Sequence, residues 1–84
     1  MRMSQQEILD ALGAIVQEAT GIPAARVVPD ASFINDLDVD SLSMVEIATM
    51  AEDKFSISIP DADLAKLKTV ADVVAYIAKA GVLA

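Results

Sequence analysis

The chain has 84 residues, a formal net charge of −7, and neither cysteine nor histidine. The missing cysteine excludes a disulfide scaffold, thiolate catalysis and zinc–cysteine sites. The missing histidine removes the commonest general base and the commonest metal ligand, so the chain is a poor candidate for an enzyme. The strong acidity argues against nucleic acid and anionic membranes as partners and favours proteins with basic surfaces.

One domain spanning residues 1–84 is expected, because this length is too small for two. Neither a signal peptide nor an apolar run long enough to cross a bilayer is recognisable in the sequence. We therefore expect a cytoplasmic protein without stable membrane association, and we expect it to be a monomer.

The first helical signal lies near the start of the chain. Ser4 and Glu7 have the spacing of a capping box, in which each side chain bonds the other residue's backbone at a helix start. Apolar residues then recur at helical spacing, and Gly21 provides a stop. The pattern predicts a helix from about Gln5 to Ala19.

Residues 21 to 39 show no sustained period and form a long connection for so small a domain. Long connections usually carry function or are held by their own apolar residues. We expect five side chains to hold this loop against the core: Ile22, Val27, Phe33, Ile34 and Leu37.

A second long helix is predicted from Asp40, a good N-cap, to about Phe55. With about 100° of rotation per residue, one side of this helix gathers a core stripe. The stripe consists of Met44, Ile47, Ala48, Ala51 and Phe55. The opposite side is mostly acidic or polar, but it also carries Leu42 and Val45, one turn apart.

Two interpretations of this apolar pair are open. Exposed leucine and valine occur singly on many protein surfaces and need no explanation. Alternatively, the pair is the centre of a docking surface ringed by acids, which would meet a basic-rimmed groove on a partner. Seven of the thirteen acids lie between Arg26 and Lys54, a stretch without a basic residue: Asp30, Asp36, Asp38, Asp40, Glu46, Glu52 and Asp53.

Residues 56 to 59 alternate like a strand, but a lone strand has no partner. We expect an extended link whose two isoleucines point inward. Pro60 and Asp61 then open a short, weakly patterned helix through Leu67.

A second capping box, Thr69-Val70-Ala71-Asp72, opens the last helix, which Gly81 is expected to close. Together these elements predict an all-α fold. Its architecture is a four-helix up-and-down bundle with a long loop between the first two helices and a short third helix.

The residues around Ser41 match neither a calcium-binding loop nor the surroundings of a catalytic serine. The segment Asp36 to Asp40 places acids as in the first half of a calcium loop, but Ser41 replaces the glycine and Ile47 replaces the bidentate glutamate. We therefore predict no metal site. As a catalytic nucleophile, Ser41 has no histidine to activate it and no G-x-S-x-G turn around it. We predict no catalytic residue.

The segment Asp38-Val39-Asp40-Ser41-Leu42-Ser43-Met44-Val45-Glu46 resembles the phosphopantetheine attachment site of bacterial acyl carrier proteins. Further matching motifs lie along the chain: Asp36-Leu37, Glu52-Asp53 followed by Phe55, Ile59-Pro60-Asp61 and Leu67-Lys68-Thr69-Val70. The resemblance covers essentially the whole chain, from Ile8 to Ile77, and it implies the four-helix fold of that family.

The resemblance implies that a separate phosphopantetheinyl transferase moves 4'-phosphopantetheine from coenzyme A onto the Ser41 hydroxyl. Asp40 and Leu42 complete the attachment motif. The prosthetic group would supply the thiol that this cysteine-free chain lacks. The start of a helix suits a phosphodiester, because free N–H groups and the helix dipole favour negative charge there.

The resemblance also assigns two further sets of residues. Partner docking falls on Leu42, Val45, Glu46, Glu52, Asp53 and Asp38. The acyl pocket falls on Met44, Ile47 and Ala48, with Ile59, Leu64 and Leu67 opposite. Ser43 and Thr49 depart from the family pattern, where many members carry an acid and a methionine, which puts the choice of partner in doubt.

The function that the resemblance implies is that of a carrier in fatty acid biosynthesis. Its partners would be the transferase and the synthase enzymes, namely ketosynthases, reductases, dehydratase and malonyl transferase, bound through their basic surfaces. One alternative is a carrier of a polyketide or other secondary pathway. An alternative of another class is an acidic protein-binding adaptor without a prosthetic group.

Overall fold

The computed structural model describes residues 3–82. Its elements are α1 (Gln5–Thr20), the 3-10 helix η1 (Ala24–Arg26), α2 (Ser41–Phe55), α3 (Asp61–Leu64), α4 (Val70–Ile77) and the π-helix η2 (Ala78–Val82). Within the described range β-pairing is limited to one isolated antiparallel bridge, between Ser32 and Thr69. The predicted all-α, four-helix architecture is confirmed.

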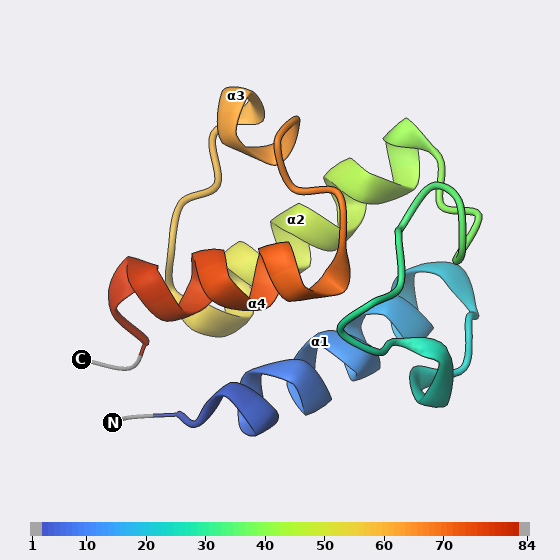
Figure 1. Ribbon diagram of the computed structural model, residues 1–84. Helices are drawn as coiled ribbons and strands as arrows, with labels where there is room; N and C mark the ends of the chain where they lie inside the picture. The colour runs from blue at the N-terminus through green and yellow to red at the C-terminus, as the bar shows by residue number, and fades with distance from the viewer. Residues whose placement is uncertain (1–2, 83–84) are drawn as a thin grey trace.

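The three longer helices form the body of the molecule. Figure 1 shows α1 running in one direction and α2 and α4 running back, while α3 stands apart above them. α1 contacts both α2 and α4, and their apolar faces share one core. The start of α1 and the end of η2 lie at the same end of the molecule, and α2 begins at the other end.

The helix starts follow from short local signals. Ser4 accepts the N–H of Glu7, and the Glu7 carboxylate accepts the N–H of Ser4, so the predicted capping box is present. Gly21 ends α1 with a φ of 80°, a left-handed conformation in which glycine meets no Cβ penalty. The second box, between Thr69 and Asp72, opens α4 as predicted.

The long loop between α1 and α2 is held by two backbone hydrogen bonds to a segment that lies far away in the sequence. The N–H of Phe33 donates to the carbonyl of Lys68 at 3.1 Å, and the N–H of Val70 donates to the carbonyl of Ala31 at 3.0 Å. The Phe33 side chain is 1% exposed, so it anchors the loop in the core. This pairing ties the loop between α1 and α2 to the turn before α4.

One of the five predicted loop anchors is wrong. Val27 and Leu37 are buried and Ile22 is half-buried, but Ile34 is 53% exposed. The N–H groups of residues 36 and 37 both bond to the carbonyl of Ser32, which closes a tight turn. Successive side chains in such a turn point in different directions, so burying one neighbour turns the Ile34 side chain outward.

The second half of the chain follows the prediction with two differences. The link after α2 buries Ile59 and half-buries Ile57, so it is extended and directed inward. α3 ends at Leu64, earlier than the predicted Leu67. Gly81 does not close the last helix, because the backbone continues through it as the π-helix η2.

Candidate functional site

Ser41 is the first residue of α2, and its side chain is exposed. Asp40 is the N-cap: its carboxylate accepts the N–H of Ser43 at 2.8 Å, and its carbonyl accepts the N–H of Met44 at 2.9 Å. Asp38 turns the chain into the helix with a φ of 56°, a left-handed conformation that aspartate tolerates better than most residues. The hydroxyl of Ser41 is therefore presented to solvent at the positive end of a helix dipole.

The cap makes a pH-dependent contribution to stability. Hydrogen bonds, chiefly from the Ser43 backbone, hold the pKa of Asp40 below the ordinary 3.8. The unfolded chain therefore binds a proton at a higher pH than the folded chain does. The stabilisation is complete above the ordinary value and is lost as the pH falls through the lowered pKa.

We expect Asp40→Ala to lower the melting temperature near neutral pH by about 4–8 °C, because it removes the cap of α2. The difference from the parent protein should shrink as the pH falls below the lowered pKa of Asp40. Melting curves followed by circular dichroism at several pH values would measure this. Asp40→Asn, an uncharged cap, is the control, and a deficit in Asp40→Ala that is independent of pH would contradict the charge argument.

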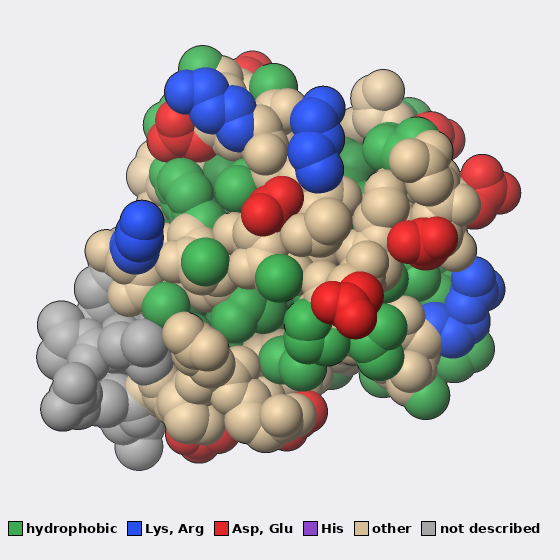
Figure 2. Space-filling view, viewed as in Figure 1, with side chains coloured by type: hydrophobic (Ala, Val, Ile, Leu, Met, Phe, Trp, Pro, Cys, Tyr) green, Lys and Arg blue, Asp and Glu red, His purple; other side chains and the backbone are tan. Residues whose placement is uncertain are grey.

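A cleft of about 790 Å³ opens beside Ser41. Its walls come from the loop (Ser32, Phe33, Ile34, Asn35), from α2 (Ser41, Met44, Val45) and from α3 with the turn after it (Asp61, Leu64, Ala65, Leu67, Lys68). In Figure 2 the upper outline of the molecule is notched between α3 and the first turns of α2. An exposed hydroxyl thus lies at the mouth of a largely apolar cavity.

The predicted acyl-pocket residues divide into two groups. Met44, Leu64 and Leu67 line the cleft. The other three, Ile47, Ala48 and Ile59, are buried in the core and are absent from the cleft walls. The sequence did not predict that the loop side chains of Phe33 and Ile34 would form the facing wall. Its only signal was that the loop is long and rich in apolar residues.

The residues predicted to dock partners lie on or next to the outward face of α2. Leu42 is 78% exposed and Val45 is 50% exposed, with Glu46 and Asp53 exposed around them. Asp38 is also exposed, just before the helix. An apolar centre with an acidic surround is therefore present on this surface.

Glu52 differs from the other acids of this set. It is half-buried, and its carboxylate accepts the backbone N–H of Ile59 at 2.7 Å. This bond fixes the link between α2 and α3. Glu52 therefore has a structural role, because it stabilises the link between α2 and α3.

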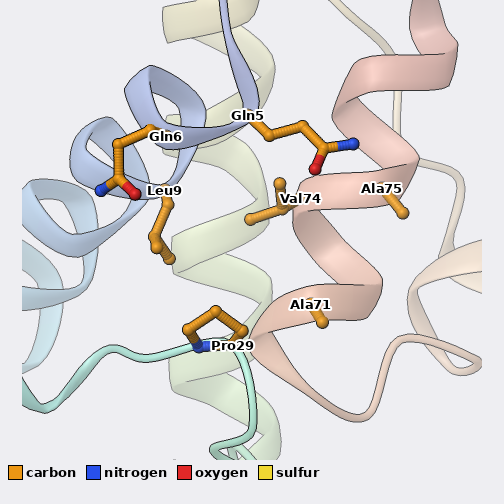
Figure 3. Close-up of a pocket in the computed structure, with 7 residues that line it drawn as sticks. All are labelled: Gln5, Gln6, Leu9, Pro29, Ala71, Val74 and Ala75. Atoms are coloured by element: carbon orange, nitrogen blue, oxygen red, sulfur yellow. The ribbon is translucent and has the colours of Figure 1, made fainter.

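A second depression of about 210 Å³ lies between α1 and α4. Figure 3 shows Leu9 and Val74 pointing into it, with Pro29 at one end and Gln5 at the other. Its walls carry neither a nucleophile nor an ionisable group, and none of them is shared with the cleft beside Ser41.

The described residues also limit the chemistry that the chain can perform. Among them, no three acidic side chains come together in a way that could hold a metal ion. No helix within residues 3–82 is both long enough and apolar enough to cross a membrane. The sequence has no histidine or cysteine, so neither of these can activate the Ser41 hydroxyl.

The sequence profile of the family described as "Phosphopantetheine attachment site" matches residues 10–77. An acyl carrier protein of Thermobifida fusca is 58% identical to this chain over 79 residues, covering 94% of this chain and 100% of the relative. This chain belongs to the bacterial acyl carrier protein family.

Other acyl carrier proteins agree with this assignment. The meromycolate extension acyl carrier protein of Mycolicibacterium aurum is 60% identical, covering 94% of this chain and 81% of the relative. The solved structure of the acyl carrier protein from Enterococcus faecalis superposes with a TM-score of 0.76 at 32% identity, covering 94% of this chain and all of the other. The likeness therefore extends from sequence to fold.

Acyl carrier proteins are carriers and not enzymes, in agreement with the prediction from composition. They hold covalently attached phosphopantetheine, are modified by a phosphopantetheinyl transferase, and interact with synthase enzymes. The family assignment overturns the alternative of an adaptor without a prosthetic group. The site fits the group, since an exposed hydroxyl stands at a helix start beside an apolar cleft.

Proposed function

We propose that Ser41 carries the phosphopantetheine and that this acyl carrier protein serves fatty acid biosynthesis, presenting a growing acyl chain as a thioester. The observation that carries the proposal is the exposed hydroxyl of Ser41 at the mouth of the 790 Å³ cleft. The group supplies the thiol that the cysteine-free chain lacks. The cytoplasmic location and the monomeric state predicted from the sequence belong to the same proposal.

The cleft suits an acyl chain because its walls are mainly hydrocarbon. Phe33 lies on one side, Met44 on the second, and Leu64 and Leu67 on the third. Each methylene group that leaves water for such a surface contributes about 0.8 kcal/mol, so a chain of several carbons gains enough to remain inside. Besides Ser41, four polar side chains of the lining lie among these apolar walls: Ser32, Asn35, Asp61 and Lys68.

The outward face of α2 is proposed as the surface that synthase enzymes and the transferase recognise. Exposed Leu42 and Val45 would supply apolar contact, while Glu46 and Asp53 would orient the protein toward basic rims. Such partners include the ketosynthases, reductases, dehydratase and malonyl transferase of fatty acid synthesis. Charge-guided encounters of this kind weaken as salt is added.

We expect Leu42→Ala to raise the KM of the phosphopantetheinyl transferase for this protein about ten-fold, because it removes the most exposed apolar side chain of the surface. Steady-state kinetics with varied carrier concentration would measure the change. Val28→Ala is the matched control, since Val28 is 46% exposed but lies in the loop and not on α2. Equal KM values for the two variants would contradict docking through α2.

A second pathway has one observation in its favour. The Mycolicibacterium aurum relative, 60% identical, is named a meromycolate extension acyl carrier protein. Meromycolate extension is therefore the second candidate function. A carrier role in a polyketide or other secondary pathway is the remaining alternative.

The test begins with the purified chain, coenzyme A and a phosphopantetheinyl transferase, and reads the intact mass for the gain of one phosphopantetheine group. The loaded protein is then offered to a malonyl transferase and to ketosynthases of the candidate pathways. Extension by a fatty acid ketosynthase at a higher kcat/KM than by a polyketide ketosynthase supports the fatty acid role. The reverse order of kcat/KM would replace it with the alternative.

A further inference from the structure

α3 is the most weakly anchored wall of the cleft. Its four residues include none that is fully buried, and no side chain caps its start. Leu64 is half-buried: it packs against the edge of the core and also lines the cleft. In Figure 1 this helix stands away from the three longer helices. Apart from this one contact of Leu64, its position depends on attachments made by neighbouring segments.

Tyr76 of α4 makes such an attachment to Asp63, and neither residue lines the cleft. Its hydroxyl oxygen lies 2.8 Å from the carboxylate of Asp63 and 3.1 Å from the carbonyl of Ser58. Both partners are acceptors, so one hydroxyl proton is shared between them. A single side chain thus connects α4 to α3 and to the link that precedes it.

The surroundings of the Tyr76 hydroxyl favour its protonated form. The hydrogen bond to Asp63 raises the pKa of Tyr76 above 10.0, and partial burial and the negative charges of Asp63 and Glu52 act in the same direction. The hydroxyl therefore remains protonated, and able to donate, throughout the physiological pH range.

Two other attachments fix the ends of the same region through the backbone. Glu52 accepts the N–H of Ile59 before α3, and the pairing of Phe33 with Lys68 holds the chain after it. Tyr76 holds α3 itself through Asp63, in addition to the contact of Leu64 with the core. Removing its hydroxyl would loosen the helix while leaving both end attachments in place.

We propose that Tyr76 is a positioning residue of the cleft: by holding Asp63 and Ser58 it keeps α3 close to the body and limits how far the cleft opens. The limit would set the length of acyl chain that the cleft shields from water. This second statement rests on the proposed function, since it requires that the cleft receives the chain.

The first experiment uses the chain without an acyl group and follows amide hydrogen exchange. Tyr76→Phe keeps the ring and removes the shared proton. The amides of Leu64 and Ala65, which donate to the carbonyls of Pro60 and Asp61 across the turn of α3, should exchange about ten-fold faster than in the parent protein. The amide of Leu12, in the buried core of α1, should change less than about two-fold.

Thr20→Val is the matched control, because it also removes a hydroxyl that bonds to a carbonyl, that of Val16 in α1. It should leave the exchange at Leu64 unchanged relative to Leu12. Asp63→Ala should accelerate exchange in α3 as Tyr76→Phe does, and the double variant should add little more. An equal acceleration at Leu12 and Leu64 in Tyr76→Phe, or fully additive effects, would overturn the proposal.

The second experiment loads saturated acyl chains of increasing length onto the holo-protein and measures the melting temperature of each. In the parent protein the gain should stop at a length set by the cleft, and in Tyr76→Phe it should stop at a longer chain. If the melting temperature stops rising at the same acyl chain length in both proteins, Tyr76 does not set the length of chain that the cleft shields. A melting temperature independent of chain length in both would overturn acyl binding in the cleft, while the exchange data would still establish that Tyr76 holds α3.

Discussion

Ser41→Ala should abolish the gain of one phosphopantetheine group when the protein is incubated with coenzyme A and a transferase. The variant lacks the only atom of this position that can form the phosphoester bond. The side chain of Ser41 is exposed, so the substitution should leave the melting temperature nearly unchanged. Intact mass and a melting curve of the same sample would separate a lost site from a lost fold.

Ser43→Ala is the matched control for this experiment, since Ser43 lies in the same turn of α2. Its backbone N–H, which bonds to the Asp40 cap, is kept in the variant. Ser43→Ala should be modified to the same extent as the parent protein. Modification that persists in Ser41→Ala would place the attachment on another residue.

Phe33→Ala should reduce the free energy of unfolding by about 3–5 kcal/mol, the usual cost of removing a buried aromatic ring. Phe33 is 1% exposed, and its backbone bonds both to Lys68 and to Val39. Its loss would leave the long loop without its largest anchor. Because a domain of this size has a total stability of only about 5–15 kcal/mol, the substitution would remove a large share of it. Urea denaturation followed by circular dichroism would measure the change.

Ile34→Ala is the natural control, because it removes an apolar side chain from the next residue, which is 53% exposed. We expect a change within about 0.5 kcal/mol, as for most surface positions. Equal destabilisation by the two variants would mean that the loop is not anchored through Phe33.

The parts of the fold that were predictable from the sequence rest on interactions between near neighbours. The capping boxes at Ser4 and Thr69 and the cap at Asp40 each involve residues three apart, so spacing alone is informative. The core stripe of α2 follows from helical periodicity in the same way. Residue type and spacing therefore determined most helix starts and the direction in which α2 faces.

The parts that were not predictable depend on contacts between distant residues or on irregular backbone. The pairing of Phe33 with Lys68 and the bond from Tyr76 to Asp63 join segments that no periodic pattern relates. Ile34 was misplaced because a turn has no period from which to infer a side-chain direction. Glu52 has the residue type of a docking acid, and only the fold reveals that it bonds the link at Ile59.

For the candidate site, the exposed position of Ser41 at the start of α2 and the outward position of Leu42 were predictable, whereas the cleft was predicted only in part. Half of the expected pocket, including Ile47 and Ala48, is filled core. A helical wheel identifies the inward face of a helix, but it cannot distinguish an inward side chain that is packed from one that borders a cavity. That distinction depends on where the loop and α3 lie.

The placement of the helix ends has a practical consequence. The start of α1 and the end of η2 lie at one end of the molecule, and α2, with Ser41, begins at the opposite end. A tag, a surface linker or a fused domain attached through either terminus would thus be directed away from Ser41 and the cleft. The carrier could be immobilised on a chip, or tethered to a synthase, with the start of α2 and the cleft left accessible to incoming enzymes.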